Sequence, residues 1–250
     1  MARFENKVAF ITGAASGIGR ATCLRLASEG ASVFAVDVDA EGLEGTAKAV
    51  LESGGTMETA ACNVTSRQSC FDAIAACVAK FGKLDILANV AGIVRFSHAT
   101  ETTEADWNLV LAVNLSGPFF LSQAAIPHLI ETKGNIVNIA SNAGLMGQAY
   151  TAGYCASKAG LINMSKALAM EFLKTDIRIN CVAPSGTATN LVSGVQFPEN
   201  ANMKLIQRYM GFRPMSQPED IVNVVAFLAS DEAVAVHGAV WEADNAVSAG

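Results

Sequence analysis

A tyrosine and a lysine four positions apart are the residues of this chain best placed to move a proton. Tyr154 and Lys158 lie in a helical stretch of sequence, and residues i and i+4 share one face of a helix. A free tyrosine has a pKa of about 10, which is too high for an effective base at neutral pH. A neighbouring ammonium favours the phenolate and lowers that pKa. The pair therefore predicts proton transfer at a phenol, although the same spacing also arises by chance on solvated helix faces.

Ser141 supplies a hydroxyl thirteen residues before the tyrosine, at the end of the apolar run Ile139-Ala140. A hydroxyl at the carboxyl end of a strand faces the crevice in which α/β proteins bind ligands. There it can hold a substrate oxygen by a hydrogen bond as charge develops. The alternative is that this serine only ends the strand in a turn. Met146 and Gln148 follow closely enough to line the same site.

A glycine-rich turn from Thr12 to Gly19 (TGAASGIG) separates the first apolar run from a helical stretch. Glycine lets the backbone approach a phosphate without a clash from Cβ, and the N-terminus of the following helix favours an anion. The spacing G-x-x-x-G-x-G differs from the common G-x-G-x-x-G fingerprint. Its place at the first strand-to-helix junction nevertheless favours dinucleotide binding over an ordinary turn. The expected contacts are Gly13, Ser16, Gly17, Ile18 and Gly19.

Asp37 ends the second predicted strand, 18 residues after Gly19. A carboxylate at this position can accept both hydroxyls of an adenine ribose, and it repels a 2′-phosphate. Ser16 and Val38 are uncharged, so no basic side chain is offered to such a phosphate, and the sequence favours NAD over NADP. A plain solvated turn residue is the alternative, and Asp39 competes for the same role.

Short apolar runs alternate with longer helical patterns along the chain. Several runs are apolar throughout, which is typical of parallel strands covered on both faces. The order predicts an α/β, doubly wound, Rossmann-like fold with a mostly parallel seven-stranded sheet and helices on both faces. The predicted strands are Lys7–Thr12, Ser32–Asp37, Thr56–Ala61, Leu84–Asn89, Asn135–Ala140, Arg178–Ala183 and Gly238–Glu242, and the predicted helices are Gly17–Glu29, Ala40–Glu52, Arg67–Phe81, Glu104–Ile130, Gly153–Leu173 and Pro218–Leu228.

One long irregular stretch, residues 184–215, interrupts this pattern. Connections of that length in a compact domain are usually lids or binding loops. Without a linker or an internal repeat, residues 1–250 are expected to form a single dinucleotide-binding catalytic domain that carries this lid. Seven of its residues form an apolar set suited to covering a hydrophobic substrate: Leu191, Val192, Val195, Phe197, Met203, Leu205 and Tyr209.

The composition excludes several classes of protein. The chain has 250 residues, 51% of them hydrophobic and 16% charged, with a net charge of −6. Nucleic-acid binding needs a basic face, and no polybasic run suggests a membrane surface. No secretory signal is recognisable, and we expect no apolar stretch near the roughly 18 residues that span a bilayer. Six cysteines without a C-x-x-C and only three histidines predict no metal site and a reducing, cytoplasmic location.

Taken together, the motifs resemble the short-chain dehydrogenase/reductase family, in its compact subgroup of about 250 residues. The similarity extends from Asn6 to about Gly238. Each motif is weak alone, but their joint order is highly specific. The matching residues are Thr12–Gly19, Asp37, Asn89-Val90-Ala91-Gly92, Asn114, Ser141, Tyr154 with Lys158, and Pro184–Thr189.

The resemblance implies a role for each of these residues. Tyr154 would be the base in alcohol oxidation and the acid in ketone reduction, and Lys158 would lower its pKa and bind the nicotinamide ribose. Ser141 would hold the substrate oxygen, and Asn114 would position a water that relays protons. Further cofactor contacts would come from Asn63, Val64, Asn89, Ala91, Gly92, Pro184, Gly186, Thr187 and Thr189.

Three departures from the family pattern stand out. Asn63 stands where the family usually has Asp, Ser185 replaces a glycine after the sixth strand, and the C-terminal tail lacks the usual Val-Asp-Gly-Gly. The tail usually lies near a subunit interface, and the resemblance implies a homotetramer.

The sequence thus predicts an NAD-dependent oxidoreductase that transfers a hydride between nicotinamide and a hydrophobic secondary alcohol or ketone. Two alternatives stay open, an NADP-dependent 3-oxoacyl reductase and a non-catalytic, dinucleotide-sensing protein. Asp37 argues against the first, and the presence of Tyr154, Lys158 and Ser141 argues against the second. A serine hydrolase is excluded because the chain has no G-x-S-x-G.

Overall fold

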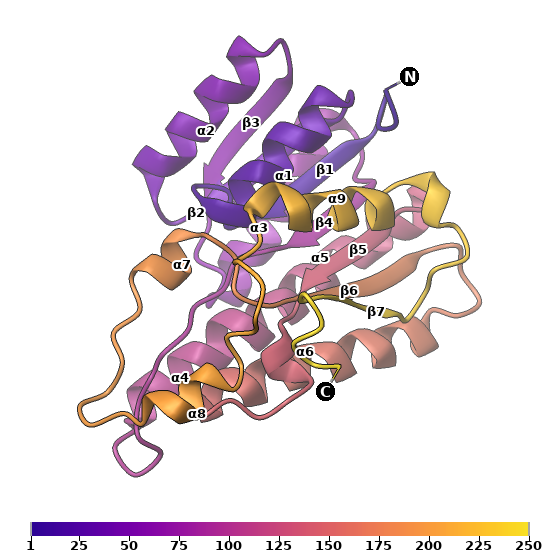
Figure 1. Ribbon diagram of the computed structural model, residues 1–250. Helices are drawn as coiled ribbons and strands as arrows, with labels where there is room; N and C mark the ends of the chain where they lie inside the picture. Colours follow the sequence, from indigo (N-terminus) through magenta and orange to yellow (C-terminus); the bar gives the residue numbers. More distant parts are fainter. Residues whose placement is uncertain (1, 250) are drawn as a thin grey trace.

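Seven strands form one parallel sheet in the order β3-β2-β1-β4-β5-β6-β7 in the computed structural model, which describes residues 2–249 (Figure 1). The order reverses between β1 and β4, which is where open α/β sheets bind their ligands. The predicted fold class is therefore confirmed, with a sheet that is parallel throughout the described residues. The strands are β1 Val8–Thr12, β2 Ser32–Asp37, β3 Thr56–Ala61, β4 Ile86–Asn89, β5 Asn135–Ile139, β6 Arg178–Pro184 and β7 Val240–Ala243.

The central strands are buried on both faces because each face carries its own hydrophobic core. Along β1, Ala9 and Ile11 face the core that contains residues of α1, α2 and α9, whereas Val8 and Phe10 face the core with residues of α3 and α5. Every residue of β1, β5 and β6 is buried. This explains why β1 is apolar from Val8 to Ile11 rather than alternating, and why buried polar residues of β5 and β6, such as Asn138 and Asn180, are hydrogen-bonded.

The longer helices agree with the predicted ones to within two residues at each end, except between residues 104 and 132. The predicted helix Glu104–Ile130 is broken into α4 and α5 by a π-helical turn, Ala112–Ser116. Turns of this kind are rare and often lie at functional sites. The helices are α1 Gly17–Ser28, α2 Ala40–Glu52, α3 Arg67–Phe81, α4 Glu104–Leu111, α5 Gly117–Thr132, α6 Ala152–Glu171, α7 Asn190–Ser193, α8 Met203–Gln207 and α9 Pro218–Ala229.

The helical run Glu104–Thr132 corrects the expectation that no apolar stretch is long enough to span a bilayer. It contains an 18-residue window with a mean hydropathy of 1.6, of which 44% is buried inside the protein. By length and composition this run passes the test for a membrane span. A helix that packs in the core of a soluble protein passes the same test, and α5 contributes Leu121, Ala125 and Leu129 to the core beneath the sheet.

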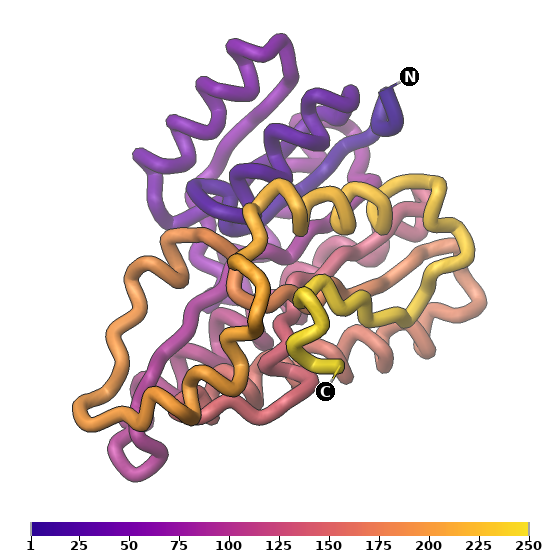
Figure 2. The backbone as a smooth tube through the Cα atoms, in the orientation of Figure 1, coloured from indigo at the N-terminus to yellow at the C-terminus, as the bar shows by residue number. Residues whose placement is uncertain are grey.

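The lid, residues 184–215, leaves the sheet after β6 and returns to it before α9 (Figure 2). It is less irregular than predicted, because it contains the short helices α7 and α8. Its two ends are joined by backbone hydrogen bonds: Ala188 N–H donates to the carbonyl of Ser216 at 2.9 Å, and Ser216 N–H donates to that of Gly186 at 3.2 Å. The lid is therefore a loop closed at its base.

A chain of buried polar side chains connects the middle of the sheet with α6. Asn89 Nδ2 donates to Asn138 Oδ1 at 2.8 Å, and Asn138 Nδ2 donates to Ser165 Oγ at 2.8 Å. Ser165 Oγ in turn donates to the carbonyl of Leu161 at 2.7 Å. These bonds fix β4, β5 and α6 relative to one another, and the last two elements carry Ser141 and Tyr154.

Replacing the middle residue of this chain tests its contribution to stability. Asn138→Leu removes both bonds and leaves Asn89 Nδ2 buried without a partner, while Ser165 Oγ keeps only its bond to Leu161. We expect the free energy of unfolding in urea to fall by about 2–3 kcal/mol. Asn163→Leu, on the exposed face of α6, is the matched control and should change it by less than about 0.5 kcal/mol. Equal effects of the two variants would contradict this account.

Candidate active site

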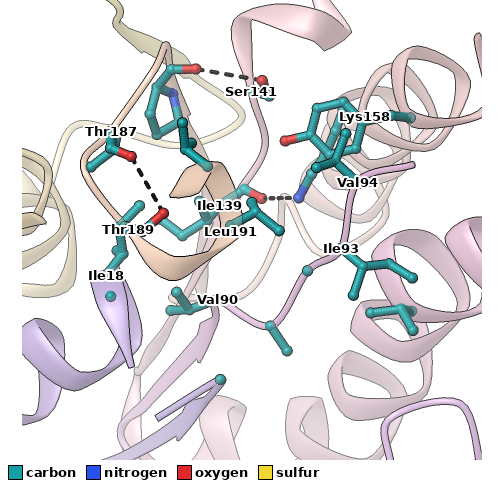
Figure 3. A pocket seen from close by; sticks show the side chains of 18 of the residues that line it. Ile18, Val90, Ile93, Val94, Ile139, Ser141, Lys158, Thr187, Thr189 and Leu191 are labelled. Carbon is teal, nitrogen blue, oxygen red and sulfur yellow. Dashed lines mark hydrogen bonds between the residues drawn. The ribbon is translucent and has the colours of Figure 1, made fainter. Parts of the chain in front are cut away.

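A cavity of about 830 Å³ opens at the carboxyl ends of the strands and is covered by the lid (Figure 3). Its wall is built from the turns after β1, β2, β3, β4, β5 and β6, from α4, the π-helical turn and α6, and from the lid. Within the part of the chain that the structure describes, Asp37 and Lys158 are the only charged residues of this wall. The cavity is thus mainly apolar, with one carboxylate and one ammonium.

The glycine-rich turn is held close to the turn that follows β4. Gly13 has a φ of +66°, and a Cβ at this residue would lie 2.9 Å from the backbone nitrogen of Ala91. A Cβ on Gly19 would overlap the carbonyl oxygen of Gly13. Only glycine fits at these two positions. The turn leads into the N-terminus of α1, where Ser16 is the N-cap without a side-chain cap bond.

Thr12 is a positioning residue that the sequence did not single out. It is buried, and its Oγ1 accepts hydrogen bonds from the backbone N–H groups of Val90 at 2.9 Å and Ala91 at 3.0 Å. These bonds set the path of the chain after β4, so that Ala91 and Gly92 border the cavity. A threonine directly before the first glycine of the turn is the only signal for this role.

Asp37, rather than Asp39, faces the cavity. Its carboxylate accepts hydrogen bonds from the backbone N–H groups of Ala15 at 3.0 Å, Val38 at 2.7 Å and Asp39 at 3.1 Å. Asp39 is instead the N-cap of α2 and accepts from Gly42 N–H at 3.1 Å. The structure therefore distinguishes the two neighbouring carboxylates: Asp37 is oriented by backbone donors at the edge of the cavity, and Asp39 caps a helix.

Ser141, Tyr154 and Lys158 meet at the other end of the cavity. Lys158 is 3% exposed, and its Nζ donates to the carbonyl of Ile139 at 2.8 Å (Figure 3). The same Nζ lies 5.8 Å from the centre of the Tyr154 ring. Ser141 Oγ accepts from the backbone N–H of Ala143 at 3.1 Å, which fixes the hydroxyl at the end of β5.

The pKa values at this end follow from burial. Burial raises the pKa of Tyr154, and the Ser141 hydroxyl opposes this shift. Burial lowers the pKa of Lys158 to about 8. The expected lowering of the tyrosine pKa by the lysine is thus not found in the protein alone. The physical reason is that burial disfavours the charged phenolate, and this effect outweighs the hydrogen bond with the Ser141 side chain.

Asn114 is buried on the π-helical turn and does not line the cavity wall. Its Nδ2 donates to the carbonyl of Ile93 at 2.8 Å and to Ser157 Oγ at 3.1 Å, and its Oδ1 accepts from Ile93 N–H at 2.9 Å. A Cβ on Gly92 would lie 3.3 Å from this Oδ1 and 3.4 Å from Lys158 Nζ. Asn114 therefore lies directly behind the lysine, where it holds the chain after β4.

The remaining predicted residues are brought together in the cavity wall with one exception. Asn89 is 2% exposed and lies behind the wall in the buried polar chain, so its side chain does not line the cavity. Asn63 lines the wall, while its Oδ1 also accepts a bond from Thr65 Oγ1 at 2.8 Å. The others in the wall are Gly13, Ser16, Gly17, Ile18, Gly19, Val64, Ala91, Gly92, Pro184, Gly186, Thr187 and Thr189.

The lid contributes an apolar surface that agrees only in part with the predicted set. Met203 and Leu205 point away from the cavity and are exposed. Gln148 lies in the wall and Met146 does not. The lid residues that line the cavity are Leu191, Val192, Val195, Phe197, Ile206, Tyr209, Met210 and Met215.

Polar contacts hold the lid against the turns after β4 and β5. Tyr209 Oη donates to the carbonyl of Ala149 at 3.0 Å, and Asn202 N–H donates to Tyr150 Oη at 2.8 Å. Phe197 packs edge-on against Phe96 at 5.2 Å between ring centres. The lid therefore closes the cavity above Ser141. No cluster of metal-ligating side chains is present among residues 2–249.

Comparisons with known proteins agree with this geometry. The family model "short chain dehydrogenase" matches residues 7–199. The chain is 39% identical to a 3-oxoacyl-[acyl-carrier-protein] reductase from Thermotoga maritima, over 97% of this chain and 98% of that one. It is 37% identical to D-threitol dehydrogenase from Mycolicibacterium smegmatis, over 95% and 91%. A solved short-chain dehydrogenase from Mycobacterium paratuberculosis, bound to NAD, has a TM-score of 0.92 and 30% identity, covering 99% of this chain and 100% of that one.

The chain therefore belongs to the short-chain dehydrogenase family. Its relatives are oxidoreductases that act on alcohol and ketone groups, and this chain is an enzyme of that kind.

The close packing of the glycine-rich turn yields a prediction about stability. Gly19→Ala places a methyl group against the carbonyl of Gly13, so the free energy of unfolding should fall by about 1–3 kcal/mol. Gly45→Ala is the control, because a Cβ there meets nothing within 4 Å on the exposed face of α2. It should raise the same quantity by about 0.5–1 kcal/mol. Urea denaturation measures both, and a neutral Gly19→Ala would contradict the close approach.

Proposed function

We propose that this enzyme uses NAD to interconvert a hydrophobic secondary alcohol and its ketone, with Tyr154 as the general acid and base. One observation carries the proposal. A single cavity has a serine, a tyrosine and a buried lysine at one end and a lone carboxylate at the other. The first set suits proton transfer at a substrate oxygen, and the carboxylate suits an adenine ribose.

The cavity fits a dinucleotide at several points. The close approach of Gly13, Gly19 and Ala91 leaves backbone without side chains where a pyrophosphate would lie. The helix α1 that follows has no acidic residue in its first turn, so its N–H groups and dipole are free to favour an anion. Thr187 and Thr189 also line the cavity, and Thr189 lies beside this turn, since a Cβ on Gly17 would be 2.9 Å from its Cγ2. These residues would hold the phosphates and the carboxamide end of the cofactor.

Asp37 supports NAD rather than NADP. Its carboxylate would accept the ribose hydroxyls and repel a 2′-phosphate, and no basic side chain lines this end of the cavity among residues 2–249. The short-chain dehydrogenase from Mycobacterium paratuberculosis was solved with NAD bound. An NADP-dependent 3-oxoacyl reductase is the second candidate, because the relative from Thermotoga maritima is named for that activity.

Tyr154 and Ser141 carry out the proton transfer. Bound nicotinamide supplies or accepts the hydride directly, so the protein has to provide only positioning and the proton. Because burial raises its pKa, Tyr154 is neutral at pH 7 and can give its proton to the oxygen of a ketone. In alcohol oxidation the same oxygen, as phenolate, receives the proton. Ser141 Oγ holds the substrate oxygen while its charge changes.

Lys158 places a positive charge beside the phenol. Its pKa of about 8 leaves the side chain largely protonated at pH 7, so it stabilises the phenolate each time one forms. We assign it also the binding of the nicotinamide ribose. Asn114, directly behind it, retains a lone pair on Oδ1 with which to hold a water that passes protons from Lys158 to solvent.

The lid and the rest of the chain complete the proposal. The apolar lid residues exclude water and favour a hydrophobic substrate.

We propose that the whole chain is one catalytic domain and that it assembles as a homotetramer. The cysteines of the described residues are all free thiols, five of them buried, in keeping with a reducing cytoplasm.

Replacing the tyrosine tests the assignment of the acid and base. Tyr154→Phe removes only the hydroxyl, so alcohol oxidation, followed by the absorbance of the reduced nicotinamide, should fall by a factor of about 10² or more. The affinity for NADH, measured by calorimetry, should stay within about threefold, because the ring remains in place. Wild-type turnover in this variant would remove Tyr154 from the mechanism.

Replacing Asp37 tests the choice of cofactor. Asp37→Ala removes the repulsion of a 2′-phosphate, so the ratio of kcat/KM for NAD to that for NADP should fall at least about tenfold. Asp39→Ala is the matched control. It should leave this ratio unchanged while lowering the free energy of unfolding by about 1 kcal/mol through loss of the helix cap. A ratio that does not respond to Asp37→Ala would reject the ribose assignment.

A further inference from the structure

We propose that the preferred substrate carries a second hydroxyl on the carbon next to the reacting one, and that Asn142 and Gln148 bind it. This inference rests on the proposed function, since it concerns the substrate end of the same cavity. Its preferred substrates would be vicinal diols and the α-hydroxyketones formed from them. Both molecules keep the second hydroxyl, so the same contact serves both directions of the reaction.

The two side chains form a bonded pair in the cavity wall. Gln148 Nε2 donates to Asn142 Oδ1 at 3.0 Å, and both residues line the cavity. Ser141 Oγ donates to the same Asn142 Oδ1 at 3.3 Å. The amide of Asn142 is therefore oriented by bonds on its oxygen side, and it lies within hydrogen-bond reach of the hydroxyl that receives the reacting oxygen.

Each amide of the pair keeps one unused polar atom. Asn142 is 3% exposed, and its Nδ2 is buried with no hydrogen-bond partner among the described residues. No residue of the described chain donates to Gln148 Oε1, the other atom of its amide. A buried amide N–H without a partner is costly, at about 1–3 kcal/mol, and such groups are rare in folded proteins. The pair thus offers one donor and one acceptor.

A hydroxyl group is the ligand that matches this pair. It accepts one hydrogen bond and donates another, whereas a carbonyl or an ether oxygen would satisfy Asn142 alone. A carboxylate or a phosphate does not match, because Lys158 is the only cationic residue of the wall and is already bound to Ile139. Tyr209, a polar lid residue of the same wall, already donates its hydroxyl to Ala149.

The position of the pair sets the distance between the two oxygens. Asn142 follows Ser141 directly in the chain, and the Ser141 hydroxyl already touches its amide oxygen. An oxygen on the adjacent carbon is therefore close enough to reach the pair while the reacting oxygen stays on Ser141. The surrounding apolar lid then packs on the rest of the carbon skeleton.

The test compares cis-cyclohexane-1,2-diol with cyclohexanol, two probes of one shape that differ by the second hydroxyl. For the wild-type enzyme with NAD, kcat/KM should be at least about tenfold higher for the diol. In Gln148→Leu and in Asn142→Leu this ratio should fall to near one. Gln207→Leu, an exposed glutamine of α8 outside the cavity, is the matched control and should keep the wild-type ratio.

A binding measurement separates this inference from the proposed function. Calorimetry of the Tyr154→Phe variant with NAD present gives the Kd of each probe without turnover, and Gln148→Leu is then added to that background. Tighter binding of the diol that disappears with Gln148→Leu supports the second subsite even if the wild-type enzyme oxidises neither probe, a result that would count against the hydride-transfer proposal alone. Equal affinity for the two probes, or a preference that survives both leucine variants, overturns the inference.

Discussion

The ammonium group of Lys158 is the constraint on which the rest of the site depends. Its burial is unfavourable for a charged group, and the carbonyl of Ile139, at 2.8 Å, is the partner that compensates. That carbonyl belongs to Ile139, the last residue of β5, so the strand itself supplies the partner of the buried ammonium. This hydrogen bond therefore fixes the end of β5, the helix α6 and the ammonium of Lys158 relative to one another.

Buried hydrogen bonds explain how a mainly apolar α/β core holds the elements around the cavity in fixed positions. Asn89, Asn138 and Ser165 link two strands to a helix, Thr12 binds the chain after β4, and Asn114 binds the same chain from the other side. None of these bonds contributes a reacting group. Because buried polar groups are costly when their partners move, they restrict the elements around the cavity to one arrangement.

The fold was largely predictable because its signals are local. Continuous apolar runs indicated buried parallel strands, and β2, β3 and the helix α3 have the predicted bounds. The π-helical turn at Ala112–Ser116 was not predictable, since it comes from packing of Asn114 against Ile93 and Ser157 rather than from any break in the helical pattern. The expectation about apolar stretches was wrong at Glu104–Thr132 for a different reason: mean hydropathy over 18 residues tolerates interspersed polar residues, whereas the prediction considered uninterrupted apolar stretches.

The candidate site was predictable as a set of residues but not as a set of roles. Glycine spacing and the order of Ser141, Tyr154 and Lys158 selected residues that do share one cavity. The sequence could not show that Asn89 lies behind the wall, that Thr12 holds the turn after β4, or that burial raises the pKa of Tyr154. These properties depend on which atoms lose contact with water, and that is decided only when distant segments pack together.

The bonds between Gly186, Ala188 and Ser216 at the base of the lid have a consequence for how the enzyme can diverge. Once the two ends of a loop are held together, a change in its length alters the entropy of closure only slowly. Insertions or deletions between residues 189 and 215 would leave the glycine-rich turn and the residues Ser141, Tyr154 and Lys158 in place. Substrate specificity can therefore be altered by changing this loop, without changing the residues proposed for proton transfer.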